Sequence, residues 1–345
     1  MLEFEIERMR EVLFQHGYDY LKFLGSGSFS CVAICKSKKY NQQFAVKQAI
    51  KHKISVDEYN TLVSLHHPNI IQLYDAFEDE DSQYLVMDYC SNGTMRDKTN
   101  LPYEYFLYYA KQILEALAFC HSNNIAHRDI KPENIFLDQY DHVKLADFGL
   151  ARQFDEENKS KEKCGSLIFI APEVLQYNEV CPFKADIWAL GITFFYLATG
   201  TYPFKTKSRE LLKKAIIAGE LDYSQCKIDP KIRFIISKMC TKNPNSRFTA
   251  QQILKLPMFS PVLTKKPTFL NDLSRKKSFT TGYLGAKAQI NKSMTFDSTQ
   301  SGFGSDGEDK PKIPAIDILS YRSINIKPNI QRMSSRGQLP SSRPL

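Results

Sequence analysis

Residues 127 to 134 read His-Arg-Asp-Ile-Lys-Pro-Glu-Asn, and residues 147 to 149 read Asp-Phe-Gly. The carboxylate of Asp129 can accept a proton from a hydroxyl group. Asn134 and Asp147 offer the hard oxygen ligands that Mg²⁺ prefers in proteins. A base and two metal ligands within one short stretch predict a site for phosphoryl transfer.

The Asp-Phe-Gly tripeptide alone would more often be an ordinary turn, so the prediction depends on the whole pattern. Together the two stretches resemble the catalytic loop and the metal loop of protein kinases. The resemblance implies an α+β fold of two lobes, a small antiparallel β lobe with one helix and a larger, mostly helical lobe. It also implies ATP and Mg²⁺ as cofactors, Asp129, Lys131 and Asn134 as catalytic residues, and Asn134 and Asp147 as the metal ligands.

A glycine-rich segment, Gly25-Ser-Gly-Ser-Phe-Ser30, precedes these motifs and lies between two strand-like runs. Glycines allow backbone N–H groups to approach phosphate oxygens closely. Such a loop is weak evidence by itself, because a plain glycine turn is commoner. In the kinase pattern Leu24, Gly25 and Gly27 contact the nucleotide. The third glycine of that pattern is here Ser30, a departure that we expect the loop to tolerate.

The run Gln43-Phe-Ala-Val-Lys47 is typical of a strand that ends in a lysine suited to the α and β phosphates of ATP. A lone lysine on a strand is usually just solvated. This lysine has a candidate partner in Glu58, on a stretch where Leu62 and Leu65 fall at helical spacing. The resemblance implies that Lys47 and Glu58 pair in the active enzyme, so that movement of this helix would control activity.

Residues 84 to 93 lead from a strand into a polar glycine turn, and the similarity to kinases makes this segment the hinge between the lobes. The backbone at Asp88 and Cys90 would then bind the adenine, with Met87 at the back of the pocket. For Met87 considered alone, an interior strand position is the simpler interpretation. The matching apolar groups that would enclose the base are Val32, Ala45 and Phe136.

Three residues of the larger lobe match structural positions of the family. Glu173 and Arg247 correspond to a buried pair of carboxylate and guanidinium. Removal of one partner would leave a buried charge and cost about 3 to 5 kcal/mol. Asp186 would anchor the backbone of the catalytic loop.

The acceptor hydroxyl is inferred from two further matches. Ser166 matches the hydroxyl residue that bridges Asp129 and Lys131 in serine/threonine kinases. Lys131 and Ser166 therefore both favour serine or threonine over tyrosine. The segment from Cys164 to Leu175 looks most like the calcium/calmodulin-dependent and AMP-activated-like branch. Ile168 and Phe169 replace the more familiar residues of that segment, so the finer substrate preference does not follow from it.

Composition agrees with an enzyme of this size, since the 345 residues are 43% hydrophobic and can bury two lobes. The longest apolar stretch, residues 187 to 199, is too short to span a bilayer. The N-terminus lacks the apolar region of a signal peptide. Eight cysteines without a Cys-x-x-Cys pair predict thiols in a reducing compartment. We expect a cytoplasmic protein, or a nuclear one, without a membrane span.

The chain is expected to divide into a helical extension over residues 1–18, a kinase domain over 19–259 and a tail over 260–345. The tail holds 14 Lys and Arg against 6 Asp and Glu, so the totals of 46 and 38 leave 32 of each elsewhere. With 13 serines and no sustained apolar period, the tail is predicted to be disordered. No nucleic-acid recognition motif accompanies its charge, so we expect no specific nucleic-acid partner, and the partner of the tail is unknown.

Two alternatives stay open beside a kinase that acts on serine or threonine of protein substrates. The chain could be an inactive pseudokinase that serves as a scaffold, although Lys47, Glu58, Asp129, Asn134 and Asp147 are all intact. It could also phosphorylate a small molecule on the same fold.

Activation presents a choice between two residues. Glu162 occupies the position at which similar kinases carry a phosphate, and its carboxylate would pair with Arg128. Ser160 is the alternative, as a site of phosphorylation. A solvated, unpaired Glu162 is the simpler interpretation of the same charge.

Overall fold

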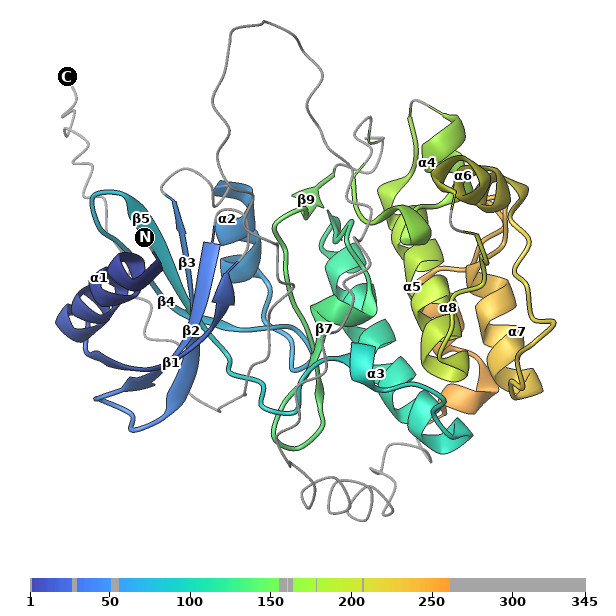
Figure 1. The fold of residues 1–345 in the computed structure, drawn as a ribbon. Coiled ribbons are helices and arrows are strands. Elements are labelled where there is room, and N and C mark those ends of the chain that lie inside the picture. The colour runs from blue at the N-terminus through green and yellow to red at the C-terminus, as the bar shows by residue number, and fades with distance from the viewer. Residues whose placement is uncertain are drawn as a thin grey trace, which may run out of the picture.

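The computed structural model describes residues 2–26, 30–50, 56–154, 160, 164–177, 179–206 and 208–260. Within them the chain forms two lobes joined side by side, a mainly β lobe and a mainly helical one (Figure 1). The predicted two-lobed α+β fold is therefore confirmed. Gly27, Glu162 and the tail from residue 261 lie outside the described residues.

The small lobe is built on a five-stranded antiparallel sheet with the strand order β1-β2-β3-β5-β4. Its one internal helix, α2 (Val56–Ser64), lies between β3 and β4 in the chain. The strands are β1 (Tyr18–Ser26), β2 (Ser30–Ser37), β3 (Gln43–Ile50), β4 (Leu73–Glu78) and β5 (Ser82–Met87).

Each face of this sheet carries buried residues of a different apolar cluster. Successive side chains of a strand point to opposite faces. On β3, Ala45 joins the core shared with the large lobe, whereas Phe44 and Val46 belong to a second cluster on the outer face. That outer cluster is completed by residues of the first helix, Met9, Val12 and Leu13.

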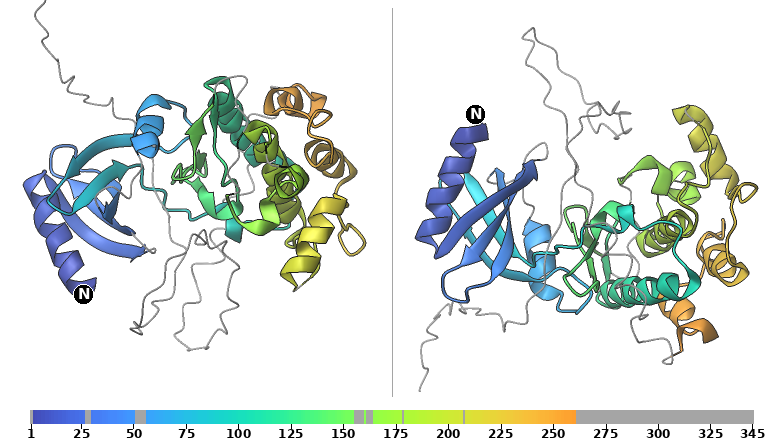
Figure 2. Two further views of the ribbon diagram at one scale, coloured as in Figure 1. Left: turned by 90° about the horizontal axis from the view of Figure 1, so that it is seen from above. Right: turned by 60° about the horizontal axis from the view of Figure 1, so that its bottom comes forward.

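Helix α1 (Leu2–Gln15) covers the sheet on the side turned away from the large lobe (Figure 2). Leu13 is fully buried there, while Phe14 beside it is 65% exposed. Arg8 joins the helix to the turn between β4 and β5, with contacts of 3.0 Å to Asp79 and 2.6 Å to Asp81. The helix thus packs as a layer of the small lobe.

The large lobe is organised around α3 (Tyr103–Ser122) and α5 (Pro182–Thr199). Helix α5 is apolar almost all round and buries Trp188 completely, as expected of a helix in the interior of a lobe. It ends at Gly200, whose φ of 72° is the left-handed conformation that favours glycine. None of the helices in the described part of the chain is long and apolar enough to cross a membrane.

The remaining elements of the large lobe are short. The helices are α4 (Pro172–Gln176), α6 (Arg209–Ala218), α7 (Pro230–Met239) and α8 (Ala250–Leu254). The strands are β6 (Ile125–Ala126), β7 (Ile135–Leu137), β8 (Val143–Leu145) and β9 (Arg152–Gln153). Single 3₁₀ turns are η1 (Met95–Asp97), η2 (Pro132–Asn134), η3 (Leu167–Phe169) and η4 (Pro257–Phe259).

Two structural predictions can be checked at this level. Arg247 donates to both carboxylate oxygens of Glu173, at 2.6 and 2.9 Å, so the expected buried pair is confirmed. No disulfide forms within the described residues, which include all eight cysteines.

Candidate active site

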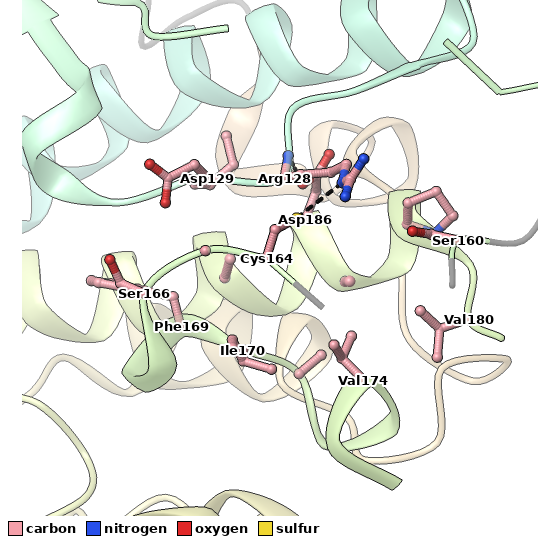
Figure 3. Close-up of a pocket in the computed structure, with 16 residues that line it drawn as sticks. Arg128, Asp129, Ser160, Cys164, Ser166, Phe169, Ile170, Val174, Val180 and Asp186 are labelled. Carbon is pink, nitrogen blue, oxygen red and sulfur yellow. Dashed lines mark hydrogen bonds between the residues drawn. The ribbon is translucent and has the colours of Figure 1, made fainter. Parts of the chain in front are cut away.

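The catalytic loop runs from β6 to η2 and is held from below by α5. Asp186 accepts hydrogen bonds from the backbone N–H groups of His127 and Arg128, both at 2.8 Å. Arg128 has a φ of 68°, a conformation that a non-glycine residue keeps only where its surroundings hold it. Figure 3 shows Asp186 lying directly beneath this turn. The predicted anchoring role of Asp186 is confirmed.

Asp129 projects from this loop, and two neighbours hold its carboxylate. Lys131 Nζ lies 2.8 Å from Asp129 Oδ2, and Asn134 Nδ2 donates to the same oxygen at 2.9 Å. Asn134 Nδ2 also donates to the backbone carbonyl of Asp129 at 2.9 Å. The three predicted catalytic residues therefore form one hydrogen-bonded group.

Residues 164–173, which we call the activation segment, pass close to this group at Gly165. Its φ is 92°, and a Cβ placed there would lie 3.0 Å from the carbonyl oxygen of Arg128 and 3.7 Å from Asp129 Oδ1. Both the conformation and the close approach require glycine. Ser166 follows and lines the same pocket (Figure 3). Within the described residues its hydroxyl is not hydrogen-bonded to Asp129, so the bridging role inferred from the resemblance stays a prediction.

The two predicted metal ligands are brought together by the β7–β8 hairpin. Asn134 immediately precedes β7 and Asp147 follows β8, and the N–H of Ala146 donates to the carbonyl of Asn134 at 3.0 Å. The amide nitrogen of Asn134 is committed to Asp129, which leaves its Oδ1 for a cation. The described residues contain no group of three His, Cys, Asp or Glu that could hold a metal by itself. A Mg²⁺ ion held by Asn134 and Asp147 would take its remaining oxygen ligands from phosphates and water.

Lys47 of β3 and Glu58 of α2 form an ion pair beside a cavity that Asp147 also lines; we call this cavity the cleft. Lys47 Nζ donates to Glu58 Oε1 at 2.7 Å. Burial alone would lower the pKa of Lys47, but the charges of Glu58 and Asp147 outweigh it and raise that pKa. A Cβ at Gly149 would lie 3.4 Å from Asp147 Oδ1 and 3.6 Å from Glu58 Oε2, so these carboxylates gather around a glycine. The structure thus shows the closed, paired arrangement.

The predicted adenine pocket lies between the lobes. Met87 and Cys90 are buried in the same cluster as the three groups expected to enclose the base, and Leu24 packs at its edge. Gly25, at the end of β1, pairs with Val32 of β2. The hinge is fixed to the large lobe by hydrogen bonds of 3.1 and 2.9 Å that link Asn92 and Gly93 to Leu137. The three groups expected to enclose the base are Val32, Ala45 and Phe136.

The side chain of Asp88 has a role that sequence reasoning missed. Its carboxylate is fully buried, 3.0 Å from Lys144 Nζ, and accepts from the Tyr74 hydroxyl at 2.8 Å. The backbone N–H of Asp88 donates to Gln72 at 3.1 Å, so its carbonyl is the group left for an adenine. A charged residue at the end of an otherwise apolar strand was the signal, but its partners are distant in the sequence.

Arg128 contacts a cysteine that the sequence did not predict as its partner. Its Nε lies 3.1 Å from Cys164 Sγ, within the pocket of Figure 3. The expected pairing with Glu162 falls outside the described residues and stays a prediction. Ser160, the alternative, is only 7% exposed and forms a backbone bridge with Val180. Ser160 is therefore largely covered in this structure.

Comparison with known proteins agrees with this geometry. Residues 18–259 match the protein kinase domain family. The chain is 35% identical over 264 residues to calcium/calmodulin-dependent protein kinase type II of Caenorhabditis briggsae, covering 71% of this chain and 49% of that protein. It is 30% identical over 256 residues to CBL-interacting serine/threonine-protein kinase 15 of Arabidopsis thaliana, covering 70% and 61%.

A third relative is an Aurora kinase of Eremothecium gossypii, 33% identical over 236 residues that cover 66% of this chain and 62% of the relative. The chain thus spans about half to three fifths of the length of these three relatives. Fold, site geometry and the match over residues 18–259 agree with the predicted resemblance. The chain belongs to the protein kinase domain family.

Proposed function

We propose that this chain transfers the γ-phosphate of Mg²⁺-ATP to serine or threonine hydroxyls of protein substrates. One observation carries the proposal: the Lys47–Glu58 pair is closed at 2.7 Å, and Asp129 is held by Lys131 at 2.8 Å. The phosphate-binding lysine and the base are therefore ordered in the same structure. Asp147, the third element of the site, contributes to the raised pKa of Lys47.

The chemistry is an in-line displacement. The substrate oxygen bonds to the γ-phosphorus, the bond to the bridging oxygen breaks, and ADP leaves. Asp129 accepts the proton of the hydroxyl, and Lys131 offsets charge that develops on the transferred group. Asn134 and Asp147 would hold Mg²⁺, which neutralises the phosphates of ATP. Lys47 orients those phosphates.

The kind of substrate hydroxyl that the site accepts is inferred from the side chain beside Asp129. Lys131 occupies the space beside Asp129, with its side chain only 18% exposed, which suits a short serine or threonine side chain. The contacts described above do not favour an inactive scaffold, because every residue needed for phosphate transfer is present. A small-molecule substrate stays an alternative, and a cytoplasmic or nuclear location stays a proposal.

A peptide array tests this function. The purified chain, supplied with Mg²⁺-ATP, should phosphorylate serine and threonine peptides and leave matched tyrosine peptides unmodified. Asp129→Asn should lower the rate by about 10² to 10⁴, the usual contribution of a positioned base. Glu210→Gln, on the exposed surface of α6, is the control and should leave the rate unchanged. Transfer to tyrosine alone, or undiminished transfer by Asp129→Asn, would show that the proposal is wrong.

A further inference from the structure

A second carboxylate lies in the catalytic loop and plays no part in the mechanism above. Glu133 belongs to η2, beside Asn134 and four residues after Asp129. Its Oε1 lies 3.4 Å from Nη1 of Arg96. Its Oε2 is buried and lacks a hydrogen-bond partner among the described residues. One oxygen is thus loosely paired and the other is unsatisfied, which is costly for a buried charged group.

Arg96 reaches Glu133 from the segment that follows the hinge. The backbone of Arg96 is fixed on both sides, because its N–H donates to Thr94 at 3.3 Å and its carbonyl accepts from the Tyr196 hydroxyl at 3.0 Å. Its side chain is 55% exposed, whereas that of Glu133 is 19% exposed. The guanidinium therefore covers a recessed carboxylate from the solvent side, and its distance exceeds that of a strong charge-assisted hydrogen bond.

An aromatic wall connects this pair to the activation segment. The ring of Tyr196 stacks on that of Tyr202 at 4.8 Å, and Tyr202 meets Phe169 edge-on at 5.7 Å. Phe169 belongs to η3, which follows Ser166 in the pocket beside Asp129. Glu133 is adjacent to Asn134, whose side chain is hydrogen-bonded to Asp129. A peptide whose hydroxyl reaches Asp129 would therefore place residues that flank its acceptor near Glu133 and Arg96.

We propose that Arg96 determines substrate specificity by occupying, with its own guanidinium, the anionic subsite that Glu133 forms beside the base. The inference rests on the proposed protein kinase function and names the substrates it excludes. An arginine or lysine of the substrate would have to displace Arg96 or share one carboxylate with it, and two cations at one carboxylate repel each other. The enzyme therefore gains nothing from a basic residue beside the acceptor.

Removal of Arg96 should reverse this behaviour. Glu133 would then present one open and one unsatisfied oxygen, and a substrate guanidinium can satisfy both in a bidentate contact. Arg96→Ala should accordingly acquire a preference for arginine at one flanking position. Because Glu133 provides the charge, Glu133→Gln in the same chain should abolish the new preference.

The experiment uses the full chain and a peptide series with one serine and neutral flanks, in which arginine occupies each flanking position in turn. The readout is kcat/KM for each arginine peptide divided by kcat/KM for the neutral peptide. We expect a ratio near one for the wild type and about tenfold or more at one position for Arg96→Ala, the size of one charge-assisted contact. The double variant with Glu133→Gln should return to a ratio near one.

The matched control is Arg10→Ala, which removes an arginine from an exposed pair with Glu7 on α1 and should keep the wild-type ratio. A tenfold preference for arginine already present in the wild type would overturn the inference. An unchanged ratio in Arg96→Ala would do the same. In both cases transfer to the neutral peptide would leave the proposed function standing, whereas transfer to no peptide at all would overturn that function and this inference with it.

Discussion

Two buried ion pairs, one in each lobe, are satisfied to very different degrees. In the large lobe, Arg247 and Glu173 are 0% and 3% exposed, and Arg247 also donates to the backbone carbonyls of Thr241 and Lys184 at 2.9 and 2.6 Å. In the small lobe, the described residues give Lys47 Nζ one ion-pair partner, Glu58 Oε1, and the lysine side chain is 17% exposed. The first pair is closed on all sides, and the second faces the space that ATP would fill.

The difference separates structure from catalysis. A lysine ammonium carries three N–H donors, and one contact with Glu58 leaves donors for phosphate oxygens. The guanidinium of Arg247 has an acceptor at each of its three nitrogens, so it has little left to offer a ligand. We therefore expect loss of Arg247 to affect stability and loss of Lys47 to affect turnover.

The largest effect on stability should come from Arg247→Ala. It leaves the Glu173 carboxylate buried without its partner, and the free energy of unfolding should fall by about 3 to 5 kcal/mol. Urea unfolding measures the loss. The double variant Arg247→Met with Glu173→Leu removes both charges and should recover most of it. An Arg247→Ala protein with wild-type stability would break the comparison.

The outer face of the small lobe should rank next. Leu13 of α1 is fully buried against the sheet, and Leu13→Ala should cost about 2 to 3 kcal/mol through the cavity it leaves. Phe14→Ala is the control. Phe14 is the exposed neighbour of Leu13, and loss of its ring should lower the free energy of unfolding by only about 0.5 kcal/mol. Equal losses for the two variants would mean that α1 does not stabilise the lobe as described.

A smaller effect is expected close to Arg247. Thr249 caps α8 by accepting from the backbone N–H of Gln252 at 3.2 Å, and the Gln252 side chain accepts from the N–H of Thr249 at 2.8 Å. Thr249→Ala should lower the free energy of unfolding by about 1 kcal/mol, whereas Thr249→Ser should keep most of the cap. A loss as large as that of Arg247→Ala would mean that the cap, rather than the ion pair, holds this region.

The smallest expected effect is the change with pH in the stability that the Lys47–Glu58 pair contributes. The pKa of Lys47 is raised above its ordinary value of 10.5, so the ion pair is fully present below that value and is lost only as the pH rises through the higher one. The difference in unfolding free energy between wild type and Lys47→Met should therefore stay constant from about pH 7 to 9. A difference that shrinks within this range would show that Lys47 loses its proton there.

The residues that the sequence predicted well are those whose types and spacing belong to a family motif. Asp129, Asn134, Lys47 and Glu58 were placed from such motifs, and the structure brings them together. The amphipathic N-terminal run predicted a helix. It could not show where that helix packs, because Leu13 meets Phe44 and Val46 only after the sheet has formed.

Contacts between distant segments with no motif were missed. Lys144 meets Asp88, and Arg96 meets Glu133, across separations that local spacing does not encode. Each pair follows from strand and loop positions that only the folded chain brings side by side. The same holds for Arg128 and Cys164, which belong to the catalytic loop and the activation segment.

The measurement that tests the account most directly is a pair of readouts on one preparation of Lys47→Met. Phosphate transfer from Mg²⁺-ATP to a serine peptide should fall by about 10² to 10³, the usual effect of losing one preorganised donor to the transferring group. The urea midpoint, measured on the same sample, should fall much less than that of Arg247→Ala, because the side chain of Lys47 is partly exposed and that of Arg247 is fully buried. Retained transfer together with a large loss of stability would contradict the claim that the cleft pair serves catalysis.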